Sequence, residues 1–568
     1  MRILFLTHAF NSLTQRLFVE LGAAGHQVSV EFDINDSVAM EAVALFKPDL
    51  IIAPFLKRAI PETIWRRHVC LVVHPGIPGD RGPSSLDWAI LKGRRCWGVT
   101  VLQANGEMDG GDIWADVEFE MRQASKGSLY RNEVTEAAVK AVLLAVDRFQ
   151  GGKFQPMPQH RLDPARRGGW QPVMPQSVRR IDWRSDSTDL VMQKIRSADG
   201  VPGVKQELFG RELYLYDARA EKRLSGNPGE VIARSGPAVA IATVDGAVWI
   251  GHVRDRLGEH PFKLPATCLL DKEVSGLSEV EPTEHSGYRE IWYEETEEVG
   301  YLHFPFYNGA MSTSQCQALL EAFRQAKRRD TRAIVLLGGP DYWSNGMHLN
   351  QIEAAGSAAD ASWRNINAID DLALEIIRSE EHLTIAALQG NAGAGGVFLA
   401  RAADEIWARD GVILNPHYKD MGNLYGSEYW SYLLPRYVGE ENAAAIIANR
   451  LPLGAVQAAA LRLVDRVIDD SGDRFLSQVR SLAETMVRTP AFAERLHYKN
   501  ARRRADERLK PLSRYREEEL EQMKRNFYGF DPSYHIARYN FVHKIPKSRT
   551  PLTIARHRRT ATSWKYAS

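Results

Sequence analysis

At positions 72–83 the chain reads Val-Val-His-Pro-Gly-Ile-Pro-Gly-Asp-Arg-Gly-Pro. An apolar run comes before this stretch, so His74 is expected at the end of a strand. The proline and glycine residues after it favour turns that leave the backbone open beside the imidazole. Further along, positions 108–113 read Met-Asp-Gly-Gly-Asp-Ile and place the carboxylate of Asp109 on a second turn. A histidine and an aspartate on neighbouring strand ends can polarise a carbonyl group and move a proton, as acyl transfer to or from an amine requires.

Short apolar segments alternate with helical ones around this stretch. Strands are predicted over residues 3–7, 28–33, 50–53 and 69–73, with helices over 11–25 and 39–46. This alternation is typical of a Rossmann-like sheet of parallel strands, whose ligands bind at the carboxyl ends of the strands, where His74 falls. No Gly-x-Gly-x-x-Gly motif follows the first strand, which argues against a nicotinamide cofactor.

The histidine and aspartate pattern resembles the active site of the 10-formyltetrahydrofolate-dependent formyltransferases. The resemblance implies that His74 and Asp109 are catalytic and that 10-formyltetrahydrofolate is the formyl donor. It also implies that the donor binds beside Arg81, Gly82 and Pro83. Each residue alone would also fit a structural role, with the histidine ending a strand and the aspartate forming a turn.

The chain departs from the formyltransferase pattern at position 72. Val72 stands where those enzymes have an asparagine that hydrogen-bonds the formyl oxygen. Loss of one such donor typically costs about 3–4 kcal/mol of transition-state stabilisation. Either another group replaces this donor, or the formyl acceptor is a better nucleophile than a primary amine.

Two glycine-rich turns follow strands predicted over 333–337 and 384–388. They read Tyr-Trp-Ser-Asn-Gly-Met-His-Leu at 342–349 and Gly-Asn-Ala-Gly-Ala-Gly-Gly at 390–396. Small residues let backbone amides approach a thioester oxygen, and the second turn adds the N-terminus of a helix. This pair resembles the enoyl-CoA hydratase/isomerase (crotonase) superfamily. The resemblance implies an oxyanion hole formed by the amides of Met347 and Gly395, with coenzyme A lying against Asn345, Gly346 and Gly396.

The acid/base carboxylates of the hydratases are missing. Phe398 and His417 stand where hydratases carry glutamates, so hydration of an enoyl group is not expected. A polar and aromatic segment follows, from which His417, Tyr418 and Glu428 are our candidates for acid/base work. Each of these three also fits a role in packing or capping.

Composition and length agree with several domains. A chain of 568 residues is too long for one core, and 44% hydrophobic with 25% charged residues is ordinary for globular proteins. The net charge of +1 implies neither nucleic acid nor an anionic membrane as a partner. The four cysteines form no Cys-x-x-Cys pair, so we expect neither a disulfide framework nor a metal site. No signal peptide or membrane span is expected, and we predict a cytoplasmic protein.

We therefore predict an α/β multidomain protein. A Rossmann-like formyltransferase domain is expected over 1–175 and a small β-barrel domain over 176–285. A crotonase-like domain over 286–480 and a helical C-terminal region over 481–568 should follow. The small domain resembles the β-barrel of methionyl-tRNA formyltransferase. Its basic residues Arg179, Arg180 and Arg184 are too few to predict binding of RNA, so a spacer role is favoured.

The fusion of the two enzyme types resembles the HoxX family of nickel–iron hydrogenase maturation proteins. The motifs at 74–83 and 425–430, the latter reading Tyr-Gly-Ser-Glu-Tyr-Trp, carry this resemblance. It implies that formyl passes from 10-formyltetrahydrofolate to coenzyme A and that formyl-CoA is then decarbonylated to carbon monoxide and coenzyme A. It also implies small-molecule partners and, among proteins, the assembly proteins of the hydrogenase iron site.

Two other functions remain open from the residues. One is an N-formyltransferase acting on an amine, with the third domain serving as a regulatory acyl-CoA-binding domain. The other is a non-catalytic maturation scaffold that binds folate and coenzyme A without turnover.

Overall fold

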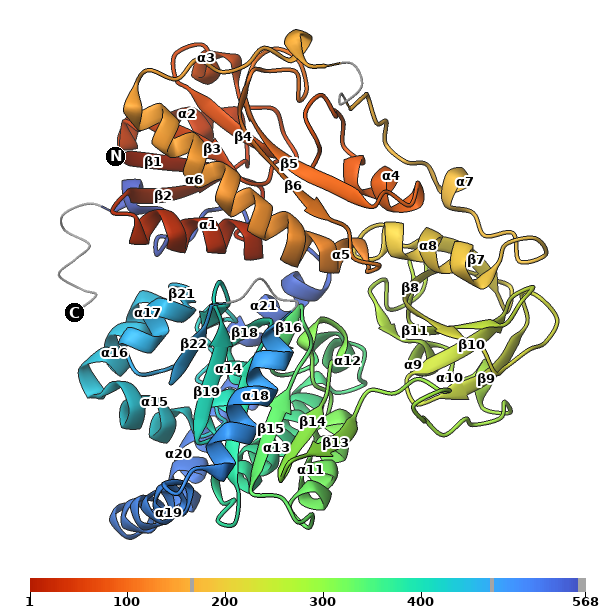
Figure 1. The fold of residues 1–568 in the computed structure, drawn as a ribbon, viewed down its shortest axis with the longest axis vertical. Coiled ribbons are helices and arrows are strands. Elements are labelled where there is room, and N and C mark those ends of the chain that lie inside the picture. The colour runs from red at the N-terminus through yellow and green to blue at the C-terminus, as the bar shows by residue number, and fades with distance from the viewer. Residues whose placement is uncertain (164–167, 470–473, 560–568) are drawn as a thin grey trace. The chain divides into compact units, whose positions relative to one another are not determined.

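The computed structural model describes residues 1–163, 168–469 and 474–559 and divides into two compact units. Unit 1 comprises Met1–Arg289 and the segment from Lys547 onward, and unit 2 comprises Glu290–Pro546. The chain leaves unit 1 once and returns to it after unit 2, as the colours of Figure 1 show. The helices expected in a separate C-terminal region therefore belong to unit 2. Residues 560–568 of that region lie outside the described residues.

The first sheet of unit 1 confirms the Rossmann-like expectation. Its parallel strands are β1 (Arg2–Thr7), β2 (Gln27–Phe32), β3 (Leu50–Ala53) and β4 (Cys70–His74), in the order β2-β1-β3-β4. Two further strands, β5 (Cys96–Gln103) and β6 (Ile113–Glu120), extend the sheet in antiparallel orientation. These two strands were not predicted from the sequence. The short link between β5 and β6 leaves no room for the crossover helix that a parallel pair needs, so they pair in antiparallel orientation.

Helices cover this sheet. Helix α1 (Ser12–Ala23) begins at Asn11, whose side chain accepts a hydrogen bond from the Thr14 amide at 3.0 Å. Helix α1 packs against α6 (Thr135–Gly151), while α2 (Asp36–Phe46) contacts β1 and β2 (Figure 1). The shorter helices of unit 1 are α3 (Glu62–Trp65), α4 (Ser85–Leu91), α5 (Lys126–Leu129), α7 (Gln176–Arg179), α9 (Ala266–Leu269) and α10 (Asp271–Val274).

A small antiparallel β domain follows, as expected. Its strands β7 (Val204–Leu208), β8 (Arg211–Glu221), β9 (Val231–Ser235), β10 (Ala238–Ala242) and β11 (Ala247–Asp255) lie in the order β7-β8-β11-β10-β9, and β12 (Leu264–Pro265) pairs with β11. Helix α8 (Thr188–Ala198) packs on β8. Arg179, one of the three basic residues noted above, is buried against the carboxylate of Asp87, so it adds nothing to a basic surface.

Unit 2 contains two sheets. The larger has the order β13 (Trp292–Thr296), β14 (Val299–His303), β15 (Ala333–Leu337), β17 (Leu383–Leu388), β19 (Glu405–Arg409) and β22 (Arg466–Ile468), parallel except for β13. The smaller has the order β16 (Tyr342–Ser344), β18 (Asn391–Gly393), β20 (Ile413–Asn415) and β21 (Leu453–Gly454). Strands β16 and β18 lie within the two glycine-rich stretches, and because they are parallel neighbours, these stretches are brought side by side.

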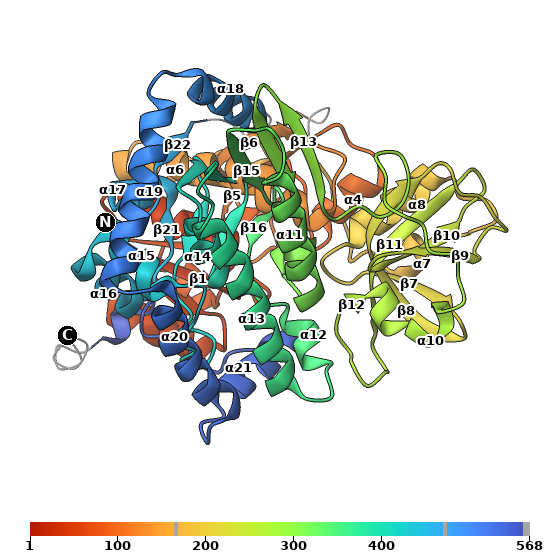
Figure 2. The ribbon, with the colours of Figure 1, turned by 90° about the horizontal axis from the view of Figure 1, so that it is seen from below.

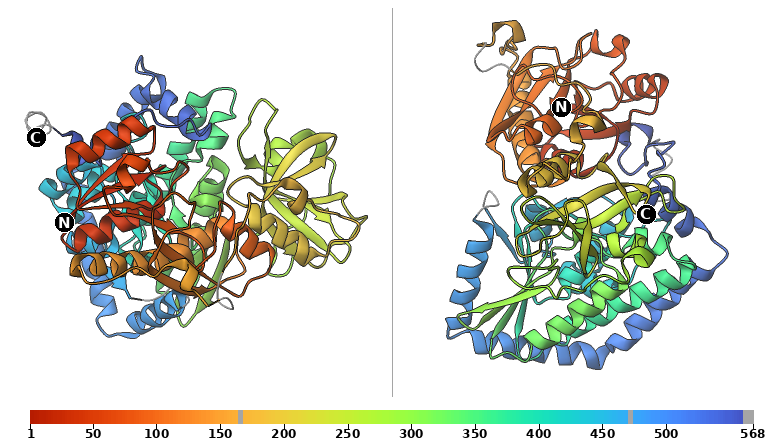
Figure 3. Two further views of the ribbon diagram at one scale, coloured as in Figure 1. Left: turned by 90° about the horizontal axis from the view of Figure 1, so that it is seen from above. Right: turned by 90° about the vertical axis from the view of Figure 1, so that its right-hand side faces the viewer.

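Helices enclose both faces of the larger sheet. Alternate strand residues face α18 (Phe475–Arg488) on one side and α11 (Thr313–Ala326) with α13 (Ala358–Ile377) on the other. Helix α13 lies between α11 and α20 (Leu512–Tyr528), as Figures 2 and 3 show. The other helices are α12 (Leu349–Glu353), α14 (Gly395–Arg401), α15 (Trp430–Val438), α16 (Glu440–Asn449), α17 (Ala455–Ala460), α19 (Phe492–Leu509) and α21 (Ser533–Val542). Over the described ranges, no helix combines the length and apolar character needed to cross a bilayer.

The returning segment covers the edge of the first sheet. Strand β2 is the edge strand, and its Val30 amide donates to the Ile554 carbonyl at 3.0 Å. The buried carboxylate of Glu31 on β2 accepts from Thr550, from His557 at 2.9 Å and from Arg558 at 2.7 Å. Burial alone would raise the pKa of Glu31, but these hydrogen bonds outweigh it and lower the pKa. The closing residues, which the sequence left uninterpreted, thus protect an open sheet edge.

We predict that Glu31→Gln lowers the free energy of unfolding by about 3 kcal/mol, because it leaves His557 and Arg558 without their buried anion. Chemical denaturation of the full chain measures this. Since the folded-state pKa of Glu31 is lowered, the difference from wild type should be complete at neutral pH and shrink as the pH falls below 4.5. Glu41→Gln removes an exposed partner of Arg558 and should change stability little; equal losses in both variants would contradict the prediction.

Candidate functional site

The first candidate site lies at the end of β4 in unit 1. The His74 ring has its Nε2 atom 2.9 Å from Oδ2 of Asp80 and its Nδ1 atom 3.5 Å from Oδ2 of Asp109. The three side chains are nearly buried, with 4%, 0% and 15% of their surfaces exposed. The structure thus brings together the predicted His74 and Asp109 and adds Asp80, to which the sequence analysis gave no role.

The turn that carries Asp109 is held from two sides. Asp109 has a left-handed backbone (φ 51°), and its carboxylate accepts the Gly82 amide at 3.0 Å. The side-chain amide of Gln159 donates to the carbonyls of Asp109 and Gly111, each at 2.8 Å. These contacts fix the carboxylate beside the imidazole and show that Gln159, also missed in the sequence, supports the site.

The predicted folate residues take different positions. Gly82 has φ 109°, and a Cβ atom there would lie 2.2 Å from the Gln171 carbonyl oxygen, so only glycine fits. Arg81 is half-buried and donates to Gln159 at 3.3 Å and to Glu107 at 3.0 Å. Pro83 is exposed. Of the three, Gly82 is the residue in contact with Asp109.

Asp80 is tied to His74 by the turns between them. Ser85 donates a hydrogen bond to Asp80 Oδ2, and the other carboxylate oxygen is buried without a partner in the described part of the chain. A Cβ atom on Gly76 would lie 2.4 Å from His74 Nε2 and 2.5 Å from Asp80 Oδ2. Glycine at position 76 therefore lets the segment after His74 fold back, so that Asp80 contacts the imidazole. The glycines between His74 and Asp80 were the sequence signal that could have identified Asp80.

The second candidate site lies in unit 2, where the glycine-rich turns meet. A Cβ atom on Gly346, which has φ 73°, would lie 3.5 Å from Gly395, and one on Gly396 would lie 2.1 Å from the Ser344 carbonyl. Within the described ranges, the amide N–H groups of Met347 and Gly395 have no hydrogen-bond acceptor. Two unpaired donors side by side can bind one oxygen atom that carries negative charge.

Asn345 lies at the rim of this site. Its side chain is exposed and donates to the Asn308 carbonyl at 2.8 Å, which ties the first turn to the preceding loop.

A buried tyrosine–glutamate pair lies against the second turn. The Tyr418 hydroxyl donates to Oε2 of Glu428 at 2.6 Å, and the Phe398 ring stacks on Tyr418 with centroids 5.4 Å apart. A Cβ atom on Gly395 would come within 2.0 Å of Glu428 Oε1, so this carboxylate lies directly beside Gly395. His417 is buried, but no hydrogen bond joins it to this pair in the described structure, and its Nδ1 atom has no partner there. The structure thus brings together two of the three acid/base candidates.

Burial sets the proton affinities of these groups. Burial and the negative charge of Asp370 raise the pKa of Glu428 to about 8, and hydrogen bonds from Tyr418 and the Ser427 amide offset this only in part. Burial and the nearby carboxylates raise the pKa of Tyr418 well above its ordinary value, so it stays a donor. Burial lowers the pKa of His417. Glu428 is therefore the member of the group that can take up and release a proton near neutral pH.

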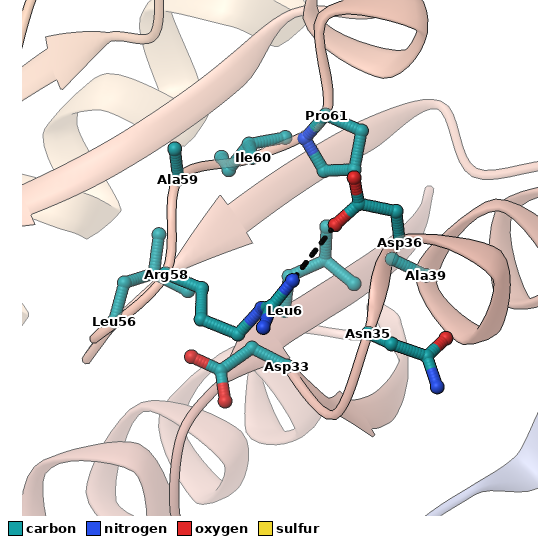
Figure 4. Close-up of a pocket in the computed structure, with 10 residues that line it drawn as sticks. All are labelled: Leu6, Asp33, Asn35, Asp36, Ala39, Leu56, Arg58, Ala59, Ile60 and Pro61. Atoms are coloured by element: carbon teal, nitrogen blue, oxygen red, sulfur yellow. Dashed lines mark hydrogen bonds and ion pairs between the residues drawn. The ribbon is translucent and has the colours of Figure 1, made fainter.

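A pocket in unit 1 is separate from these residues. It lies beside β1 and α2 and is crossed by an ion pair between Arg58 and Asp36 at 3.2 Å (Figure 4). None of the residues proposed from the sequence lines it, so it is not a candidate site.

Comparisons with known proteins find three families along the chain, two within unit 1 and one within unit 2. Residues 26–146 match the formyl transferase family model, residues 174–259 match the formyl transferase C-terminal domain, and residues 299–537 match the enoyl-CoA hydratase/isomerase model. The chain is 58% identical to the hydrogenase maturation factor HoxX of Bradyrhizobium diazoefficiens, over 98% of this chain and 97% of that protein. It is 24% identical to the methionyl-tRNA formyltransferase of Syntrophus aciditrophicus, over 38% of this chain and 69% of that enzyme.

Among solved structures, the chain is similar to HypX from Aquifex aeolicus, crystallised in complex with tetrahydrofolic acid. The identity is 49%, the TM-score is 0.95, and the match covers 99% of both chains.

We predict that Gly395→Ala lowers the free energy of unfolding of the full chain by about 1–3 kcal/mol, because the new methyl group overlaps the Glu428 carboxylate in a packed interior. Chemical denaturation measures the loss, and a crystal structure of the variant should show the carboxylate displaced. Gly356→Ala is the matched control, since a Cβ atom there meets no atom within 4 Å. An unmoved carboxylate in the Gly395 variant would contradict the placement.

Proposed function

The chain belongs to the family of the hydrogenase maturation factor HoxX, and from this membership and the two sites we propose that it makes carbon monoxide for hydrogenase maturation. In this proposal, 10-formyltetrahydrofolate donates its formyl group to coenzyme A at His74 and Asp109, and formyl-CoA is decarbonylated beside Glu428. The tetrahydrofolate bound to the related Aquifex HypX supports the first substrate. The observation that carries the second step is the Glu428 carboxylate lying against Gly395, whose amide, like that of Met347, has no acceptor in the described part of the chain.

The geometry around His74 supports the formyl-transfer step. The ring would donate a hydrogen bond from Nδ1 to the oxygen of the tetrahedral intermediate, while Asp80 holds its orientation through Nε2 and Asp109 lies 3.5 Å from Nδ1. Asp109 would relay a proton to the departing folate nitrogen through water. A thiol reacts as its thiolate, which is a strong nucleophile, and this fits the presence of Val72 where amine-acting formyltransferases have a further donor.

Decarbonylation needs only a proton transfer and the loss of one bond. The amides of Met347 and Gly395 would hold the thioester oxygen, as the crotonase-like turns suggest. Glu428 takes the formyl proton, the carbon–sulfur bond breaks with its electron pair going to sulfur, and carbon monoxide leaves. Glu428 then returns the proton to the thiolate, so no oxidant or reductant is required. Tyr418 orients the carboxylate through its hydrogen bond.

Product analysis separates this proposal from the two alternatives. Incubation with 10-formyltetrahydrofolate and coenzyme A should release carbon monoxide, scored by its binding to a haem protein. Formation of an N-formylated amine instead would support an N-formyltransferase. If neither carbon monoxide nor an N-formylated amine forms, the result would support a non-catalytic scaffold. Because Phe398 and His417 replace the hydratase glutamates, crotonyl-CoA should not be hydrated. We also propose the assembly proteins of the hydrogenase iron site as partners that receive the product.

We predict that His74→Ala and Asp109→Asn each lower folate-dependent formyl transfer to coenzyme A by at least about a hundredfold, the scale of general acid–base catalysis. Single-turnover formation of formyl-CoA measures the effect. Asp112→Asn changes an exposed carboxylate on the same turn and should keep wild-type activity. Near-native transfer in both site variants would remove the assignment.

For decarbonylation, we expect Glu428→Gln and Tyr418→Phe to reduce carbon monoxide release while formyl-CoA accumulates or is hydrolysed to formate. Both changes keep the shape of the pair and remove its proton-transfer groups. In the wild-type protein, release should rise with pH towards about 8, because the ionised form of Glu428 is the base. Tyr425→Phe serves as the control on the same loop. Wild-type release from both site variants and from His417→Ala would show that the acid/base group is elsewhere.

A further inference from the structure

Two further carboxylates are buried next to Glu428. Asp370 on α13 and Glu519 on α20 are both completely buried, and the two helices lie side by side (Figures 2 and 3). Removing a carboxylate from water costs much unless hydrogen bonds or opposite charge replace the water. Their contacts therefore indicate what these two residues do.

Asp370 holds the backbone at Glu428. Its Oδ1 atom accepts the Glu428 amide at 2.8 Å, and its Oδ2 atom accepts the Ser427 hydroxyl at 2.8 Å. One carboxylate thus fixes both the residue that carries the proposed base and the residue before it.

Glu519 holds the next part of the same turn. Its Oε2 atom accepts the Tyr429 amide at 3.0 Å, and its Oε1 atom accepts the Ser431 amide at 2.8 Å. It also accepts the Ser431 hydroxyl at 2.5 Å, and the oxygen of Ser427, whose hydroxyl donates to Asp370, lies 3.3 Å away. The turn that leads into α15 is therefore held by hydrogen bonds to two acids, Asp370 on α13 and Glu519 on α20.

The turn needs this support because its backbone is strained. Glu428 and Tyr429 both have φ 59°, a left-handed conformation that residues with a side chain rarely adopt. Consecutive amides captured by carboxylates keep the conformation in place. The conformation in turn directs the Glu428 carboxylate towards Gly395.

One cation faces this cluster in the described structure. Arg516 on α20 has Nε 3.9 Å from Asp370 Oδ2, and it also pairs with the exposed Asp371 at 2.7 Å. The other titratable groups that face the cluster are neutral: the hydroxyls of Tyr418 and Tyr429, and the buried thiol of Cys316.

These surroundings give Asp370 a lower pKa than Glu519 and Glu428. Burial, partly offset by Arg516, raises the pKa of Asp370 to about 6, so it is mostly ionised at neutral pH. Burial and the charge of Asp370 raise the pKa of Glu519 to about 8, like that of Glu428.

We propose that Asp370 and Glu519 are positioning residues for Glu428: they hold its left-handed turn so that the carboxylate lies against Gly395, and Asp370 supplies the fixed negative charge beside it. The inference rests on the proposed decarbonylation at Glu428 and adds the residues that prepare this base. The charge of Asp370 disfavours a second negative charge, so Glu428 binds its proton more strongly and is a more effective base for the formyl hydrogen.

The test is the titration of Glu428 in the full-length protein. Infrared difference spectroscopy follows the carbonyl band of the protonated carboxyl group, which Glu428→Gln identifies by removing it. Asp370→Asn keeps an oxygen that accepts the Glu428 amide but removes the charge, and it should lower the titration midpoint by about one pH unit. The acid limb of the carbon monoxide release profile should move in the same direction, with the KM for coenzyme A unchanged. Asp371→Asn removes an equal charge from the same helix at an exposed position and should leave the midpoint in place.

A second variant keeps the test possible if the Asp370→Asn protein does not fold. Glu519→Gln also keeps an acceptor oxygen and neutralises the other buried acid, so it should move the midpoint downward as well. An unmoved midpoint in the folded variants, with Glu428→Gln still unable to release carbon monoxide, would overturn the inference and leave the proposed function standing. Wild-type release from Glu428→Gln would overturn the decarbonylation proposal and the inference together.

Discussion

A buried carboxylate must find hydrogen-bond donors, and much of this structure is arranged to supply them. At the first site, Asp80 and Asp109 obtain theirs from His74, from the Ser85 hydroxyl and from the Gly82 amide. At the second, three acids share the hydroxyl of Tyr418 and the amides of one strained turn. At the first site glycine permits the close approach of the turns, whereas at the second the acids hold a turn whose left-handed residues, Glu428 and Tyr429, carry side chains.

The sequence identified the parts of each site that lie in one continuous stretch. His74 and the two glycine-rich turns could be found because each follows a strand, and parallel strands deliver their ends to one edge. Asp109 was found from its own motif, since it lies in the link between the antiparallel strands β5 and β6. Asp80 was within the quoted stretch, but only the path of the turns shows that it returns to the imidazole. Asp370 and Glu519 could not be found in this way, since they read as ordinary acids on amphipathic helices and reach Glu428 through helix packing.

In the fold, too, features within one continuous stretch could be predicted and features formed by distant segments could not. The alternation of strands and helices predicted the parallel core of the first sheet, whereas β5 and β6 were missed. The charged residues near the C-terminus had no interpretation because their partner, Glu31, lies on the second strand of the chain. Local patterns therefore indicated the elements, while contacts between distant segments had to come from the structure.

The return of the chain to unit 1 has a consequence for its synthesis. Strand β2 is synthesised before unit 2, whereas the residues that cover its edge, from Thr550 to Arg558, are synthesised only after all of unit 2. While unit 2 is being synthesised, the edge of β2 is uncovered, and such strand edges pair readily with other chains. A product that stops before Thr550 would keep this edge uncovered, so aggregation or proteolysis would remove incomplete molecules.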